Sequence, residues 1–141
     1  MTAPRMAGPH VYTVDEANAL VTDLEAAFGR LDEMREQLRA VKIKLTALEM
    51  IWGSSVNQRD CPDHKEGVDL VRQLKELEEA FNAVLAGLAE RSVTVKDIES
   101  GLLDVFHVRD GTLVNLCWQR GEPRFLAWHH VDAGFAGRQP L

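Results

Sequence analysis

The side chains that could do chemistry gather in one short stretch, "NLCWQRGEPRFLAWHH", at positions 115–130. It holds one of the chain's two cysteines, two of its three tryptophans and two of its five histidines. Thiol and imidazole groups bind metals or act as nucleophile and base. The stretch therefore predicts either a chemical site or the floor of a small core whose polar groups are hydrogen-bonded.

One hypothesis is a metal site, structural or catalytic, centred on His129. Zinc, manganese and iron take thiolate, imidazole and carboxylate ligands in proteins. The other candidate ligands that a short sheet would bring near His129 are His107, Glu122, Asp104 and Cys117. The alternative for His107 and His129 is a core imidazole hydrogen-bonded to a backbone carbonyl or a carboxylate.

Cys117 could also be a reactive thiol. If the "RG" after the second expected strand forms a two-residue turn, Cys117 lies in one row between Asp104 and Arg124, with strands about 4.8 Å apart. The guanidinium would favour the thiolate and the carboxylate would oppose it. We therefore expect an inert buried thiol beside an ion pair, with His130 as the base that a reactive thiol would need.

The same register sorts the remaining residues onto two faces of the sheet. The more apolar face, expected to pack on the helices, would hold Trp118, Phe125, His107 and His129. The other face would hold Cys117, Arg124, Trp128 and His130. A bulge at Gly121 would shift the third strand by one residue and exchange its faces.

A separate segment, "CPDH", places Cys61 and His64 at a spacing that can share one zinc ion. A structural zinc site needs four ligands, and no second Cys/His pair lies close in sequence. The segment is more typical of a solvated turn.

Two helices are expected to precede the sheet. Thr13 and Glu16 have capping-box spacing, so the first helix should begin at residue 13. Apolar residues then recur at alternating steps of three and four to residue 52, and a second such series covers 68–91. A polar segment at 53–67 separates the two series. We expect a long antiparallel coiled-coil hairpin.

The first helix is longer than the second, so residues 14–30 extend past the hairpin with an apolar stripe of their own. That stripe must be covered by the C-terminal sheet or by another subunit. Together with the helix seams, it favours a homodimer.

From Val93 the apolar period changes to two, which predicts a three-stranded antiparallel β-meander over 102–130 with "RDG" as its first turn. Residues 1–12 are expected to be a flexible N-terminus. Residues 131–141 are expected to be an irregular tail anchored by Phe135. The predicted fold class is α+β, in one domain spanning 1–141.

Composition excludes several classes of function. The 141 residues carry a formal net charge of −6, so a nucleic-acid partner is not expected. No apolar run reaches the length of a membrane span, and the N-terminal segment lacks the apolar centre of a signal peptide. We expect a soluble cytoplasmic protein whose two cysteines are free.

The blocks "YTVDEANALV", "VTVKDIESGLLDV", "LCWQRGEPRFLAWHH" and "GFAGRQPL" resemble the bacterial domain of unknown function 2203 family, nearly over the whole chain. The resemblance rests on a Gly-Leu-x-Asp strand, Leu-Cys-Trp, Gly-Glu-Pro, a Trp-His pair and Gly-Phe-x-x-Arg. It points to Asp104, Cys117, Glu122, His129 and Arg138 as candidate residues. It implies no activity.

Two functions follow from these patterns. The first is a small non-catalytic binding or scaffold protein, homodimeric through its helices. The alternative is a metal-binding protein that uses His129 with the ligands named above. A redox role for Cys117 ranks third. Further candidate site residues are Arg124, Trp118, Trp128, His130 and Arg138.

Overall fold

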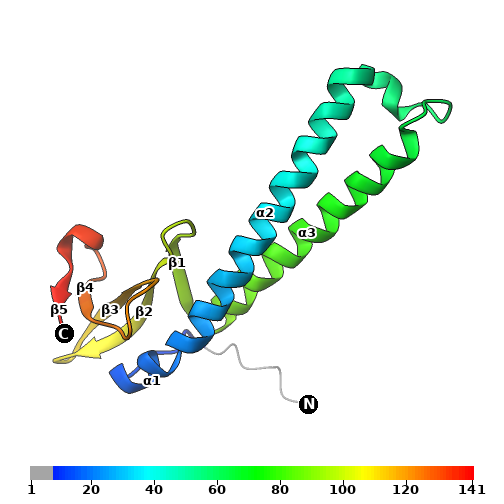
Figure 1. The fold of residues 1–141 in the computed structure, drawn as a ribbon. Coiled ribbons are helices and arrows are strands. Elements are labelled where there is room, and N and C mark those ends of the chain that lie inside the picture. Colours follow the sequence, from blue (N-terminus) through cyan, green and yellow to red (C-terminus); the bar gives the residue numbers. More distant parts are fainter. Residues whose placement is uncertain (1–7) are drawn as a thin grey trace, which may run out of the picture. The chain divides into compact units, whose positions relative to one another are not determined.

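The computed structural model describes residues 8–141, which form two compact units. One unit, here the sheet unit, contains residues 8–28 and 86–141. The other, here the hairpin unit, contains residues 29–85. Helices precede an antiparallel sheet (Figure 1), so the predicted α+β class is confirmed.

The sheet unit begins with α1 (Val14–Ala19) and the first turns of α2 (Val21–Trp52). The predicted capping box is present: the Glu16 amide donates to the Thr13 hydroxyl at 3.1 Å, and the Thr13 amide donates to the Glu16 carboxylate at 2.9 Å. The expected single helix over 13–52 is interrupted at Leu20. The Leu20 amide donates to the Ala17 carbonyl, which tightens one turn.

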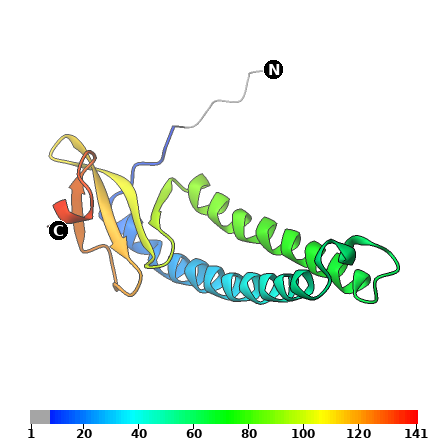
Figure 2. The same ribbon diagram turned by 90° about the horizontal axis from the view of Figure 1, so that it is seen from above.

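The hairpin unit consists of the rest of α2, the 3₁₀ helix η1 (Gly53–Asn57) and most of α3 (His64–Glu90). Helices α2 and α3 run antiparallel (Figures 1 and 2), as the helical hairpin prediction requires. Their shared core contains Val41, Leu48 and Leu70, with Leu45, Trp52, Val56, Leu74 and Leu77 packed against it. Supercoiling of the two helices stays a prediction.

Helix α3 begins at His64, earlier than the expected residue 68. The Gly67 amide donates to the Asp63 carbonyl at 3.0 Å, so this glycine lies inside the first turn and does not end the loop. The Trp52 indole donates to the Asp63 carboxylate at 2.7 Å, which ties the start of α3 to the end of α2.

The sheet has five antiparallel strands in sequence order, whereas three were predicted. They are β1 (Val93–Asp97), β2 (Leu102–Arg109), β3 (Thr112–Gln119), β4 (Ala127–His130) and β5 (Gln139–Pro140). The two additional strands, β1 and β5, lie at the edges. Pro140 lacks an amide hydrogen, and an edge strand tolerates that loss.

The turn between β2 and β3 follows the prediction. Asp110 and Gly111 both have positive φ, 49° and 77°, which fits the type I′ turn of a tight hairpin. Asp104 therefore pairs with Cys117, as predicted.

The predicted register of the third strand is wrong. Cys117 pairs with Ala127, not with Arg124, because residues 120–126 form a longer connection than a two-residue turn. Pro123 cannot donate to a strand ladder. The shift is odd in number, so the strand's two faces exchange. Ala127 and His129 share the face of Cys117, while Trp128 and His130 lie on the opposite face.

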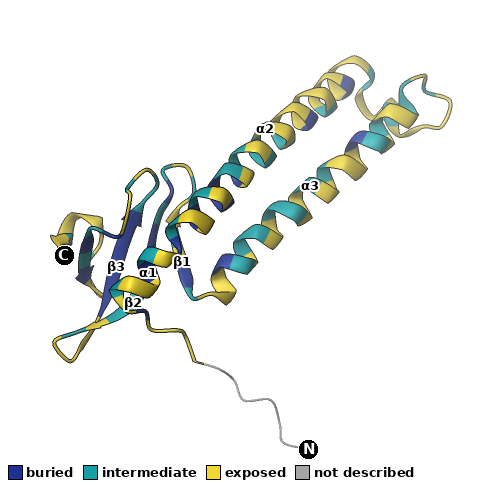
Figure 3. Ribbon diagram, turned by 60° about the horizontal axis from the view of Figure 1, so that its bottom comes forward, coloured by how far each residue is buried: buried dark blue, intermediate teal, exposed yellow. Residues whose placement is uncertain are grey.

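That opposite face carries the core of the sheet unit (Figure 3), with Leu103, Val105, Val114, Leu116 and Trp118 buried. The Trp118 ring lies 6.2 Å from the Phe28 ring and 6.4 Å from the Phe125 ring. Residues 14–28, the part of the apolar stripe that lies in the sheet unit, are thus covered by the chain's own sheet. The expected anchor of the tail is wrong, since Phe135 is 48% exposed.

Within residues 8–141, no helix combines the length and apolarity needed to cross a membrane.

Candidate metal centre

Asp104, Cys117 and His129 come together on one face of the sheet, from strands β2, β3 and β4. Asp104 and Cys117 are directly paired, and His129 is paired with Asn115, two residues before Cys117. One ligand atom from each of the three lies within 4.8 Å of the other two. Their exposed fractions are 3%, 1% and 3%, so the cluster is closed to solvent.

Two hydrogen bonds fix the orientation of the His129 ring. Nδ1 lies 2.8 Å from the His130 carbonyl oxygen, and Nε2 lies 3.0 Å from the Asp104 carboxylate. A carbonyl oxygen only accepts, so Nδ1 donates. Nε2 then faces Asp104, and one hydrogen must lie between these two groups for the contact to be favourable. The ring is in the orientation that would present Nε2 to a metal.

The surroundings of Cys117 favour the neutral thiol over the thiolate. Burial raises its pKa to about 11, and the charge of Asp104 and its hydrogen bond to the thiol act in the same direction. Glu122 also raises it, while Arg138 lowers it. The cation near this thiol is thus Arg138 and not the predicted Arg124. A thiol of this kind is a poor nucleophile near neutral pH unless a metal displaces its hydrogen.

Glu122 and Arg138 form an ion pair beside the cluster. Nη2 of Arg138 donates to both oxygens of the Glu122 carboxylate, each at 2.7 Å. The Gln119 amide donates to the same carboxylate at 2.6 Å, and the Trp118 indole donates to the Glu122 carbonyl at 3.0 Å. These bonds occupy Glu122, which is absent from the three-residue cluster.

The other predicted ligands and candidates lie elsewhere. His107 is on the opposite face of the sheet, with Nδ1 donating to the Tyr12 carbonyl at 2.7 Å. On that same face the Trp128 ring contacts His130 and lies under the Arg109 guanidinium. Arg124 is exposed in the connection between β3 and β4.

The "CPDH" segment shows no metal-type arrangement. Nδ1 of His64 lies 2.9 Å from the Val56 carbonyl, and Cys61 is a half-buried free thiol. In residues 8–141, Asp104, Cys117 and His129 form the one group of three metal-type side chains with converging ligand atoms.

The sequence predicted all three residues as candidate ligands of one metal site, but the predicted register put His129 on the opposite face from Asp104 and Cys117. The missed signal is Pro123, which disfavours a strand starting directly after Gly121. A later start would have moved His129 to the face of Asp104 and Cys117. The pairing of Glu122 with Arg138 was also missed, because nothing in the sequence brings the tail back beside β4.

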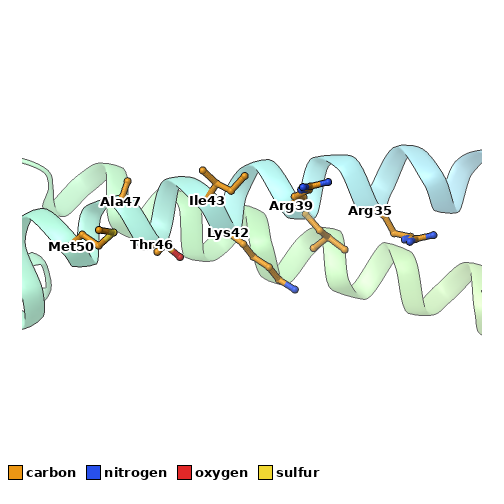
Figure 4. Close-up of a pocket in the computed structure, with 8 residues that line it drawn as sticks. Arg35, Arg39, Lys42, Ile43, Thr46, Ala47 and Met50 are labelled. Carbon is orange, nitrogen blue, oxygen red and sulfur yellow. The ribbon is translucent and has the colours of Figure 1, made fainter. Parts of the chain in front are cut away.

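A shallow groove also runs along α2 in the hairpin unit (Figure 4). Its apolar members include Ile43 and Met50, which are 61% and 82% exposed. Arg39 and Lys42 line it too, and within residues 8–141 neither makes an ion pair. The remaining lining residues are Arg35, Leu38, Thr46 and Ala47.

Comparison with known proteins gives a family without an assigned activity. The family model described as "Uncharacterized conserved protein (DUF2203)" matches residues 10–141. No curated protein and no solved structure gives a significant match.

Proposed function

The chain belongs to the DUF2203 family of uncharacterised conserved proteins, and we propose that it is a small metal-binding protein. The ligands are a carboxylate oxygen of Asp104, Sγ of Cys117 and Nε2 of His129. The observation that carries the proposal is the convergence of these three atoms, from three adjacent strands, within 4.8 Å.

The spacing of these atoms supports the proposal. Ligand atoms of a tetrahedral zinc ion, at bond lengths of about 2.0–2.3 Å, lie about 3.3–3.8 Å apart. The 3.0 Å from Nε2 of His129 to Asp104 is slightly shorter than that, so this pair would move apart slightly to bind an ion, and all three ligand atoms already lie within 4.8 Å of one another. The Nδ1 hydrogen bond to the His130 carbonyl is the outer contact that commonly orients a ligating histidine.

The donor set favours zinc over the other metals considered. One thiolate and one imidazole suit zinc and iron, while manganese prefers oxygen ligands. Three protein ligands leave a tetrahedral ion one open position, and the near-complete burial of the three residues keeps that position away from bulk solvent. This fits an ion that clamps β2, β3 and β4 and takes a water molecule as its fourth ligand. We therefore expect no catalytic turnover.

Elemental analysis of untagged protein tests this function. We expect about one equivalent of zinc, bound with a rise in melting temperature by mass action. Asp104→Asn and Cys117→Ser should each weaken binding at least about tenfold. Cys61→Ser is the matched control, since it removes the other thiol and should bind like wild type. Less than about a tenth of an equivalent, with no uptake on titration, ends the proposal.

A second candidate function is a homodimeric scaffold, and the exposed groove of α2 favours it. Helix α3 carries exposed Val68 and Val71, followed two turns later by exposed acidic residues. Consider an antiparallel pairing of α2 with the partner's α3 that sets Ala47 beside the partner's Val71. Arg39 then comes beside the partner's Glu79, because Arg39 lies about 12 Å from Ala47 along its helix and Glu79 lies about 12 Å from Val71. In this pairing, apolar residues of one helix would contact apolar residues of the partner, and basic residues would contact acidic ones.

Light scattering after size exclusion tests the dimer. Met50→Glu should yield a monomer, whereas Val108→Glu, at an exposed position on the sheet, should not change the mass. Arg39→Glu should weaken the dimer, and adding Glu79→Arg should restore it. A monomeric wild-type mass at micromolar concentration sinks this candidate.

We also propose that the protein works in the reducing cytosol. Both cysteines are free thiols, and the proposed ligand role of Cys117 requires a reduced sulfur.

A further inference from the structure

The C-terminal tail returns beside the buried cluster after leaving β4. Residues 131–141 turn through the 3₁₀ helix η2 (Phe135–Gly137) and pair with β4 as the two-residue strand β5. The Leu141 amide donates to the Leu126 carbonyl at 2.9 Å and closes the return. Arg138, within this return, lies close enough for its charge to act on the Cys117 thiol.

We propose that residues 131–141 form a strap that must open before a divalent metal can reach Asp104, Cys117 and His129, and that the Glu122–Arg138 ion pair latches it. The metal part rests on the proposed function. The opening of the strap does not, because reaction of the Cys117 thiol reports it without any metal.

Something must move for a ligand to enter. Cys117 is 1% exposed, and its two partners are 3% exposed. The face opposite the cluster is closed by the aromatic core around Trp118. Strands β2 and β3 are paired over their full length of eight residues each, so opening between them would disrupt the centre of the sheet.

The strap is the part that costs least to move. It is held to β4 by only two paired positions, Ala127 with Pro140 and Trp128 with Gln139. Most of its side chains are exposed, Val131 and Phe135 by about half. Segments with few buried contacts and short ladders open locally without global unfolding.

Glu122 is the member of the ion pair that is fixed to the sheet. Its carboxylate is held by the Gln119 amide and its carbonyl by the Trp118 indole, so it stays with the sheet when the tail moves. Arg138 approaches it through Nη2 alone. Nε of Arg138 is buried without a hydrogen-bond partner, which costs free energy in the closed strap, and opening would remove that cost by exposing Nε to water.

Native-state labelling of Cys117 with a maleimide tests the strap, in a Cys61→Ser background so that a single thiol reacts. Arg138→Ala and Glu122→Gln should each accelerate labelling at least about tenfold, since both break the latch. Arg124→Ala is the matched control, because it removes a cation from the same connection without touching Glu122, and it should label at the unsubstituted rate.

The two latch variants separate opening from electrostatics. In a closed strap, losing Arg138 raises the thiol pKa and slows labelling, whereas losing the Glu122 charge does the reverse. Acceleration by both variants therefore supports opening. Opposite changes, or no change in either, overturn the inference.

The rate of zinc release tests the part of the proposal that concerns the metal. Release of zinc to a chelator should accelerate in both latch variants and stay unchanged in Arg124→Ala. If wild type binds no zinc, the proposed function fails while labelling still judges the strap. If zinc binds but loading and labelling proceed at wild-type rates in the variants, the strap fails alone.

A second measurement uses no latch variant, so it still tests the strap if Arg138→Ala and Glu122→Gln do not fold. At low urea, labelling of Cys117 in otherwise unaltered protein should depend little on denaturant, because local opening exposes little surface. A steep dependence equal to that of global unfolding would show that the thiol is reached only through the unfolded chain.

Discussion

At the scale of single residues, three buried side chains hold two hydrogens that a cation could replace. His129 donates from Nδ1 to the His130 carbonyl, so Nε2 and the Asp104 carboxylate share one hydrogen. The Cys117 thiol keeps the other. The same residues can therefore be a hydrogen-bonded cluster without metal and a ligand set with it.

Two substitutions at Asp104 should differ in cost in the metal-free protein. An asparagine amide can still donate to Nε2 of His129, so Asp104→Asn should lower the unfolding free energy by about 1 kcal/mol. Asp104→Ala leaves the buried Nε2 unpartnered and should cost about 3 kcal/mol. Urea denaturation measures both, and equal costs would contradict the shared hydrogen.

The Cys117 thiol should make stability depend on alkaline pH. An unfolded cysteine has a pKa near 8.5, whereas the folded value is raised to about 11. Between these pH values the unfolded chain binds fewer protons than the folded one, so the unfolding free energy falls as pH rises. Thermal melts of metal-free Cys117→Ala should lack this part of the fall, and Cys61→Ser should keep it. An identical pH dependence in wild type and Cys117→Ala would be inconsistent with the raised pKa.

At the scale of elements, local signals predicted what local geometry decides. The capping box at Thr13, the helical hairpin and the Asp110–Gly111 turn each depend on a few neighbouring residues, and each is found in the structure. The register of β4 was missed because it depends on the length of the connection around Pro123. Two hydrogen bonds help to set that length: the Trp118 indole donates to the Glu122 carbonyl, and the Phe125 amide donates to the side chain of Asn18, which is far away in the sequence.

This difference explains how much of the candidate site could be predicted. Asp104 and Cys117 were placed opposite each other because a tight turn fixes that pairing. His129 was placed on the wrong face by an odd shift of one strand. The edge strand β5 and the Arg138 contact depend on the tail folding back, which no periodicity in the sequence encodes.

Two glycines in turns of the sheet should differ in their tolerance of alanine. Gly101 and Gly111 both have positive φ, but a Cβ at Gly101 would lie 2.5 Å from Cβ of Arg120, while one at Gly111 meets nothing within 4 Å. Gly111→Ala should therefore cost only the backbone strain of about 1–2 kcal/mol. Gly101→Ala should cost about 3 kcal/mol or more. Denaturant midpoints compare them, and similar costs would argue against close packing of Gly101 on Arg120.

At the scale of the whole molecule, the chain divides into a sheet unit and a hairpin unit, and the candidate chemistry lies entirely in the first. The hairpin unit instead offers an exposed apolar and basic groove on α2. The proposed metal binding and the proposed partner binding would therefore be separable, and a substitution should abolish one without the other.

Amide hydrogen exchange should show that separation. Added zinc should slow exchange in β2, β3 and β4 by stabilising the sheet unit, and leave the middle of α3 nearly unchanged. The Cys117→Ser variant should show no zinc effect in either unit. Equal slowing throughout both units would mean that the ion does not act on the sheet locally.

Cobalt titration followed by absorption spectroscopy tests the central claim most directly, because a cobalt–thiolate bond gives an intense near-ultraviolet charge-transfer band. We expect this band to saturate at about one equivalent in wild type and in Cys61→Ser, and to be absent from Cys117→Ser. No band in wild type, or a band that disappears with Cys61 and persists without Cys117, would contradict a metal centre formed by Asp104, Cys117 and His129.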